Sequence, residues 1–230
     1  KKGNNTDYIV EDLEYDVFGN NTQKTLSTTG IVPRIEKMQY DPTGRFVIKT
    51  TDILGTFSSF NYDSNFGTLL SSTNNLNQTV SYIYDTWQRK VEEKDIYNNS
   101  TKYYNDWITT GDFINGIKLT VVDATGAIKE TFTDNWGRVR LERGLSLNNK
   151  WIEKRTDYDV LDRSYKVSEP YFSTTTPSKW TITEYDIYGR IIKNTFPNGK
   201  VITTSYNGLS ATVSDGTRTQ TITKDEWGNK

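Results

Sequence analysis

The chain has 230 residues, with 28 Lys and Arg against 29 Asp and Glu, and it contains neither Cys nor His. These absences exclude a thiol nucleophile, a His-based catalytic triad, a disulfide and a zinc site of the usual ligand set. The balanced, unclustered charge argues against nucleic acids and anionic membranes as partners. Thr occurs 34 times, Tyr 15 times and Ala three times, which favours strands over helices. We therefore expect an all-β protein that is not an enzyme and holds no metal or cofactor.

No apolar run approaches about 18 residues, so no membrane insertion is expected. The chain begins at Lys1 without an initiator Met or a signal peptide, and it ends at Lys230 directly after a turn signal. We expect residues 1–230 to be one repeat region, a fragment of a larger repeat protein. The absence of Cys fits a protein that is secreted or held at the cell surface of a bacterium.

A six-residue word of the form Tyr-Asp-x-x-Gly-Arg recurs along the chain. Its two complete copies are residues 40–45 and 185–190. Recurrence of one short unit is the signature of a repeat architecture. Looser copies begin at Tyr15, Tyr84, Thr133 and Tyr158.

Each word has the composition of a tight hairpin turn. Asp favours the first position of a type I turn, and Gly favours the fourth, where a positive φ angle costs glycine least. A type I turn closed by a glycine bulge is a common connection between antiparallel strands. The residues expected to form these structural turns are Asp16, Gly19, Asp41, Gly44, Arg45, Asp134, Gly137, Arg138, Asp159, Arg163, Asp186, Gly189 and Arg190.

The turn geometry also predicts which residues face each other across the hairpin. The Asp and the Arg of a complete word are expected to form the first cross-strand pair, with opposite charges. One step outward, on the other face of the sheet, Tyr40 is expected to face Phe46, and Tyr185 is expected to face Ile191.

The turn signals are regularly spaced. From Asp41 to Asp95 they fall 10 or 11 residues apart, which leaves about seven residues for each strand. Consecutive turns then lie on alternate edges, and the chain forms a long antiparallel meander of hairpins. About fourteen turn signals predict about as many strands, and a sheet of more than ~10 strands usually curls or splits. No window has a sustained helical period, so no helix is expected.

Repeated Tyr-Asp-x-x-Gly-Arg words in a Thr- and Tyr-rich, Cys-free β chain resemble the Rhs/YD-repeat proteins. That family includes the bacterial Rhs toxins, the shell components of Tc toxins and the teneurins. The segment from Ser168 to Gly199 is especially similar, and residues 101–122 and 141–156 are the least similar. The resemblance implies a curled or spiralling sheet that is part of a hollow shell, often around a C-terminal toxin domain. The family's protease signature is not matched at residues 40–46, so no catalytic residues are transferred.

Aromatic side chains are the best candidates for ligand contact, because an aromatic face can stack on a sugar ring. Trp87 and Trp136 occupy the third position of their turns, where packing over the sheet edge is expected. Residues 107–116 and 173–179 interrupt the repeats and are expected to be loops that would carry a binding site. The candidate ligand-contact residues outside the turn words are Trp107, Trp151, Tyr171 and Trp180.

Two functions of different classes fit the sequence. The first is a structural repeat segment of an Rhs/YD-type β-shell that encapsulates or presents another polypeptide, such as a toxin domain; encapsulation follows from the resemblance alone. The alternative is an extracellular carbohydrate-binding or adhesin-like module. The expected partners are the remainder of the parent repeat protein and a C-terminal toxin domain in the first case, and glycans in the second. Open sheet edges near residues 1–15 and 219–230 are expected to favour self-association.

Overall fold

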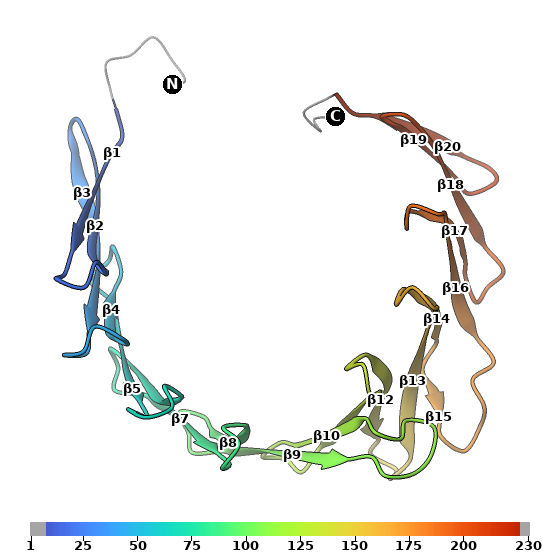
Figure 1. Ribbon diagram of the computed structural model, residues 1–230, viewed down its shortest axis with the longest axis horizontal. Helices are drawn as coiled ribbons and strands as arrows, with labels where there is room; N and C mark the ends of the chain where they lie inside the picture. Colours follow the sequence, from blue (N-terminus) through green and yellow to red (C-terminus); the bar gives the residue numbers. More distant parts are fainter. Residues whose placement is uncertain (1–7, 226–230) are drawn as a thin grey trace. The chain divides into compact units, whose positions relative to one another are not determined.

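In the computed structural model, residues 8–225 are described, and they form twenty strands and no helix (Figure 1). The described residues accordingly include no helix that could cross a membrane. The strands are β1 (Val10–Tyr15), β2 (Asn21–Thr28), β3 (Ile31–Tyr40), β4 (Val47–Thr51), β5 (Phe57–Tyr62), β6 (Leu69–Asn74), β7 (Thr79–Tyr84), β8 (Lys90–Lys94), β9 (Ser100–Trp107), β10 (Ile117–Val122), β11 (Ile128–Thr133), β12 (Val139–Leu145), β13 (Trp151–Tyr158), β14 (Ser164–Ser168), β15 (Tyr171–Phe172), β16 (Trp180–Tyr185), β17 (Ile191–Thr195), β18 (Val201–Asn207), β19 (Ser210–Ser214) and β20 (Thr219–Thr223).

The chain divides into two compact units, Lys1–Tyr103 and Tyr104–Lys230. In the first unit the strands pair in chain order from β1 to the start of β9, and every pair is antiparallel. In the second unit β10 to β13 and β16 to β20 pair in the same way. The predicted all-β fold, an antiparallel meander of hairpins, is confirmed. The strand number was underestimated, because several hairpins turn without an Asp-x-x-Gly word, as at Ser146 and Phe196.

The chain order is broken at β14 and β15, which pair with different halves of β13. Thr156 of β13 faces Val167 of β14, whereas Ile152 of β13 faces Phe172 of β15. The next strand, β16, pairs with β14 and not with β15. The predicted loop at residues 173–179 connects β15 to β16 (Figure 1).

Neither unit has a conventional hydrophobic core. Among the described residues, Leu141 is the one apolar side chain that is buried, with 9% of its surface exposed. Residues on both faces of strands such as β2 and β6 are half-buried instead. A single layer of strands leaves both faces uncovered, so stability depends on the hydrogen bonds between strands, the turns and the cross-strand side-chain pairs.

Because consecutive hairpin turns lie on opposite edges of a meander, all the Tyr-Asp words fall on one edge of each unit. We call this the Tyr-Asp edge; its turns begin at Asp16, Asp41, Asp63 and Asp85 in the first unit and at Asp134, Asp159 and Asp186 in the second. The turns of the opposite edge begin at Asp52, Asn74, Asp95, Asp123, Ser146, Phe196 and Asp215. The structural repeat is therefore two strands long, twice the spacing of the turn signals.

Candidate functional site

The side chain of each turn Asp binds the backbone of its own turn. Asp186 shows the complete arrangement: its Oδ1 accepts the backbone N–H groups of Tyr188 and Arg190, each at 2.9 Å, and its Oδ2 accepts Nε of Arg190 at 2.7 Å. Gly189 donates its N–H to the Asp186 carbonyl at 3.0 Å and has a φ of 80°. The Asp thus satisfies the turn's donors, and the Gly takes the left-handed conformation that closes it. The same contacts recur at Asp134 and Asp159.

The turn at Asp41 is one residue longer. Its N–H donates to the carbonyl of Phe46 at 2.9 Å, five positions on, whereas the matching bond of the 186–190 turn spans four. As a result Tyr40 faces Val47, so the predicted facing of Tyr40 and Phe46 is wrong. The extra loop residue shifts the register of the strand that follows the turn.

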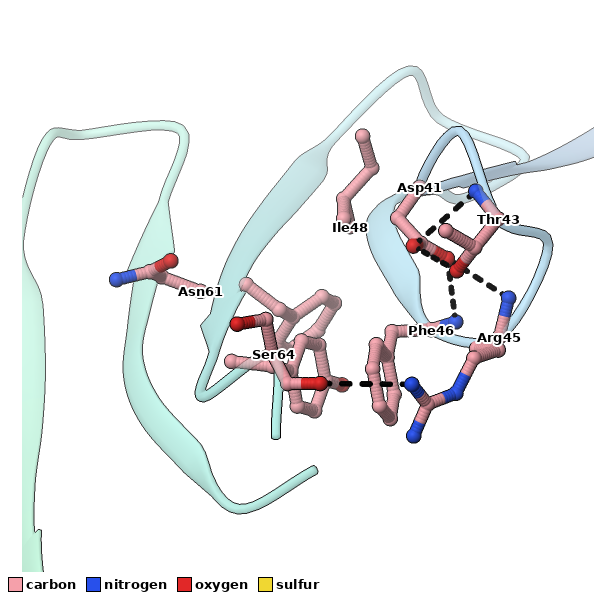
Figure 2. A pocket seen from close by; sticks show the side chains of 9 residues that line it. Asp41, Thr43, Arg45, Phe46, Ile48, Asn61 and Ser64 are labelled. Atoms are coloured by element: carbon pink, nitrogen blue, oxygen red, sulfur yellow. Dashed lines mark hydrogen bonds between the residues drawn. The ribbon is translucent and has the colours of Figure 1, made fainter. Parts of the chain in front are cut away.

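In the longer turn the backbone N–H of Arg45 donates to Asp41 Oδ1 at 2.7 Å, but its guanidinium group does not form the expected ion pair with that carboxylate. Figure 2 shows the Arg45 side chain directed away from the Asp41 carboxylate, with Nη1 3.4 Å from the carbonyl oxygen of Ser64. The guanidinium carbon lies 4.7 Å from the centre of the Phe46 ring, which stacks on Tyr62 at 5.1 Å. These side chains line a pocket of about 230 Å³ between two turns of the Tyr-Asp edge.

The hydroxyl group of Thr43 and the backbone N–H of Phe46 donate to the Asp41 carboxylate and lower its pKa to about 2. Because the folded-state pKa is below the unfolded value of about 3.9, ionised Asp41 stabilises the fold above about pH 4, and this contribution is lost as the pH falls towards 2. We expect Asp41→Asn to be less stable than the wild type at pH 5 and to approach it near pH 2. Urea unfolding at several pH values measures the difference; a constant gap between the two proteins would contradict it.

Tyr hydroxyl groups connect successive turns along the Tyr-Asp edge. Tyr185 donates to the carbonyl of Ser164 at 2.7 Å, and Tyr158 donates to the carbonyl of Val139 at 3.1 Å. In the first unit Tyr84 donates to the carbonyl at the start of β6 at 2.9 Å. In each case the acceptor is the first strand residue after the preceding turn of that edge. The Tyr of one word therefore ties its hairpin to the hairpin before it.

The turn Arg residues strengthen the same connection. The guanidinium carbon of Arg163 lies 4.5 Å from the centre of the Tyr185 ring, and its Nη1 donates to the carbonyl of Asp186 at 3.2 Å. Arg138 lies 5.0 Å from the ring of the next word's Tyr and 3.0 Å from Asp162 Oδ1. Asp162 occupies the glycine position of its turn with a φ of 66°. A carboxylate there contributes an ion pair that a glycine could not make, which offsets the cost of the left-handed backbone.

In the first unit the ring of Phe18 connects its own turn to the next turn of the Tyr-Asp edge, at Gly44. A Cβ atom on Gly44 would lie 2.4 Å from the ring of Phe18, and Asn20 Nδ2 donates to the Gly44 carbonyl at 2.7 Å. Gly44 also has a φ of 69°. Glycine at this position therefore serves both the turn and the packing between neighbouring turns.

We expect Tyr185→Phe to lower the free energy of unfolding by about 1 kcal/mol, because the Ser164 carbonyl loses its hydrogen-bond donor. Tyr188→Phe is the matched control: Tyr188 is 76% exposed at the tip of the adjacent turn, and its loss of a hydroxyl should change stability little. Chemical denaturation of both variants measures the effect. Equal stability of the two variants would show that the hydroxyl bonds along the edge contribute nothing.

A second group of side chains lies on one face of the second unit. Across neighbouring strands, Glu130 faces Arg143, Arg143 faces Glu153, and Glu153 faces Tyr171. Cross-strand partners share a face, as do residues two apart in one strand. This surface, which we call the polar–aromatic face, consists of Glu130, Phe132, Leu141, Arg143, Trp151, Glu153, Arg155, Asp157 and Tyr171.

Arg143 is at the centre of the polar–aromatic face. Its Nε lies 2.6 Å from Oε2 of Glu130, which is only 7% exposed, and its Nη1 lies 3.5 Å from Oε1 of Glu153. Its guanidinium carbon is 4.9 Å from the centre of the Phe132 ring and 4.4 Å from that of Trp151. The arginine thus forms ion pairs with two carboxylates and contacts two aromatic rings. No sequence motif marked these charged residues, because their proximity depends on the register of β11, β12 and β13.

The predicted ligand-contact residues are brought together only in part. Trp151 and Tyr171 lie on the polar–aromatic face, where burial and a hydrogen bond with Glu153 raise the pKa of Tyr171 to about 12. Trp180 lies on the same face two strands further on, because Asp157 faces Lys166 of β14, and Ser168, two residues on in β14, faces Trp180. Its Nε1 donates to the carbonyl of Pro177 at 3.0 Å, and Lys166 Nζ is 4.3 Å from its ring centre.

Three other tryptophans, Trp87, Trp107 and Trp136, do not contribute to this surface. Trp107 is 71% exposed, and its side chain makes no hydrogen bond or ring contact with any described residue. Trp87 and Trp136 are 80% and 75% exposed at their turn tips, so the expectation that they pack over the sheet edge is wrong. The tip of a tight hairpin projects beyond the strands, and no neighbouring layer covers it. Between residues 8 and 225, no group of three acidic residues is arranged to hold a metal ion.

No protein-family model matches the sequence, and no curated protein matches it. The fold, however, matches solved structures of the Tc toxin complex TcdB2-TccC3. One such structure superimposes with a TM-score of 0.69 at 14% identity, covering 89% of this chain and 13% of that one. The structure without the hypervariable C-terminal region gives 0.67 at 12% identity, covering 89% of this chain and 16% of that one. A third, TcdB2-TccC3-TEV, gives 0.65 at 12% identity over 88% of this chain and 16% of that one.

This chain therefore spans less than a fifth of the length of the structures it matches. At such identities the similarity establishes the fold. The repeat sheet shares its fold with these TcdB2-TccC3 structures, in agreement with the curled hairpin sheet that the resemblance to Rhs/YD-repeat proteins implied.

Proposed function

We propose that this chain is a wall segment of an Rhs/YD-type β-shell that encloses or presents another polypeptide, such as a toxin domain. The observation that carries the proposal is the single layer of strands, with Leu141 as the one buried apolar side chain among the described residues. A one-layer sheet stabilised within its own plane suits a wall, because each face remains available, one to an enclosed polypeptide and the other to solvent. The fold shared with TcdB2-TccC3 supports the same role.

In this role the chain is a passive scaffold without hydrolytic activity, secreted or held at the cell surface. Its partners are the remainder of a longer repeat protein and the enclosed polypeptide. Within the described residues β1 has one strand partner, β2, and β20 has one, β19. Outer strands of this kind offer backbone donors and acceptors to another copy or to further repeats. Residues 1–7 and 226–230, where edge pairing was also expected, lie outside the described residues.

The carbohydrate-binding alternative has weaker support. A sugar ring stacks on an uncovered aromatic face. The Trp151 ring is already in a cation–π contact with the guanidinium group of Arg143, and the Trp180 ring with the ammonium group of Lys166. At these two rings a glycan would have to displace the cations. The ring of Trp107 is uncovered, but among the described residues no aromatic ring lies beside it to complete a site. We expect no binding on a glycan array; binding that is lost on Trp151→Ala would favour the alternative.

A chimera tests the shell role. This chain would replace the segment of TcdB2-TccC3 that it matches in structure, and the protease resistance of the hypervariable C-terminal region would be measured. We expect the chimera to protect that region to the same extent as the parent complex. In a control chimera a Gly-Ser linker of equal length replaces the segment, and the region should be digested rapidly. A folded chimera whose C-terminal region is digested as fast as in the control would overturn the proposal.

A further inference from the structure

The loop between β9 and β10 folds onto the polar–aromatic face. Its base is closed by Ile108, whose N–H donates to the carbonyl of Gly116 at 2.9 Å. From there the loop extends towards β13 (Figure 1). The centre of the Phe113 ring lies 6.1 Å from that of Phe132. The loop's residues at positions 111, 112, 114 and 115 are exposed, whereas Phe113 is half-buried. One aromatic side chain therefore anchors an otherwise exposed segment.

The charges beneath Phe113 explain why an acidic residue precedes it. Arg140 and Arg155 lie 6.0 and 5.9 Å from the Phe113 ring centre. Both reach the same carboxylate oxygen, Oδ1 of Asp157, at 2.9 and 3.3 Å. Arg140 has a second carboxylate beside it, Oδ2 of Asp134, 3.8 Å from its Nη1. For Arg155 the loop supplies the second carboxylate, with Asp112 Oδ2 3.6 Å from Nη1 of Arg155.

The loop is held weakly at this place. The Asp112 side chain is 74% exposed, and an exposed ion pair of this kind contributes about 0–1 kcal/mol. Each cation–π contact near 6 Å contributes a similarly small amount. Beyond Phe113 the same face continues to Trp151 and Tyr171. A longer segment with the same chemistry could therefore replace the loop and contact more of the face.

We propose that the polar–aromatic face is a docking surface for an extended polypeptide segment that has an aromatic residue next to a carboxylate. The aromatic ring lies against Phe132 between Arg140 and Arg155, and the carboxylate pairs with Arg155. The chain's own loop, through Asp112 and Phe113, occupies this surface when no other segment does. That the segment belongs to the polypeptide enclosed or presented by the shell rests on the proposed function. The chemistry by which the surface recognises the segment does not depend on that function.

The probe is a peptide with the sequence of residues 108–116, titrated into the full chain and followed by the NMR signals of the Phe132 ring, which Phe113 contacts in the loop. Phe113→Ala removes the loop's anchor and leaves the surface intact. We expect this variant to bind the peptide at least about tenfold more tightly than the wild type does. Ile114→Ala is the matched control, because Ile114 is 53% exposed and does not contact the face. It should bind the peptide as the wild type does. A control peptide with Ala and Asn in place of the Phe and Asp should not bind the Phe113→Ala variant detectably.

The surface is tested in the Phe113→Ala background. Adding Arg155→Gln should weaken peptide binding at least about tenfold, whereas Lys154→Gln, on the opposite face of β13, should not. Arg155→Lys keeps the charge and checks that any loss does not come from unfolding. Equal binding by wild type and Phe113→Ala, or no effect of Arg155→Gln, would overturn the inference. If the peptide binds but the chimera leaves the C-terminal region unprotected, this surface is established and the shell role is rejected. If the chimera protects that region but the peptide does not bind, the shell role stands and this inference is rejected.

Discussion

Replacing Arg143 by Met is expected to lower the free energy of unfolding by about 3 kcal/mol, because it leaves a buried carboxylate without its closest partner. Glu130 is 7% exposed, and its next nearest polar contacts are Thr120 Oγ1 at 3.3 Å and Lys118 Nζ at 3.9 Å. Methionine fills nearly the same space between Phe132 and Trp151, so the loss reports the charge and not a cavity. Urea denaturation followed by tryptophan fluorescence measures it.

Two controls separate this effect from the loss of any ion pair. Glu130→Gln combined with Arg143→Met removes the unpaired charge and should recover most of the stability. Lys129→Met breaks the pair between Lys129 and Glu142, whose side chains are 64% and 42% exposed, and should cost no more than about 0.5 kcal/mol. A loss for Arg143→Met no larger than that for Lys129→Met would show that Glu130 is not held by this arginine.

Gly116→Ala is expected to be the most damaging single-methyl change, costing about 3 kcal/mol. An added Cβ would lie 1.8 Å from the carbonyl oxygen of Thr133 and 2.9 Å from that of Phe113. Both obstacles are backbone atoms, which cannot rotate away as a side chain would. The loop at residues 108–116 must therefore lift from β11, and Phe113 should leave the polar–aromatic face.

Gly144→Ala is the matched control, because the nearest atom to its added Cβ is a carbonyl oxygen at 3.9 Å. It should change stability by less than about 1 kcal/mol. The melting temperatures of both variants test the prediction, and the NMR signals of Phe113 report whether the loop has lifted. If the two variants have the same melting temperature and Phe113 stays in place in Gly116→Ala, the close approach of Gly116 to the Thr133 carbonyl is contradicted.

The structural features that the sequence predicted correctly are those that depend on a few consecutive residues. The Asp-x-x-Gly words predicted the hairpin meander, and Tyr185 faces Ile191 as the turn geometry required. The word at residues 40–45 is equally complete, yet its turn is one residue longer, so the facing of Tyr40 was mispredicted. The register shifts beside the Tyr of each word, as between Glu184 and Tyr185, also have no separate sequence signal.

Longer-range features could not be predicted, because they depend on which residues of distant strands are placed opposite each other. Glu130, Arg143 and Glu153 occur 13 and 10 residues apart without a motif, and only the register of β11 to β13 aligns them. The ties along the Tyr-Asp edge join residues 15 to 24 apart, as between Arg138 and Asp162. Their Tyr and Arg residues were visible in the sequence, but a single word does not reveal that words on the same edge contact each other.

The central claim, that this sheet is a wall with one face towards an enclosed polypeptide, is tested most directly by hydroxyl-radical footprinting of the chimera. Phe132, Trp151 and Tyr171 report the polar–aromatic face, and Ile152, which is 39% exposed, reports the opposite face of β13. In the isolated chain we expect both faces to be labelled. In the chimera we expect the polar–aromatic face to become protected while Ile152 remains labelled. Equal protection of both faces, or labelling of both as in the isolated chain, would contradict the claim.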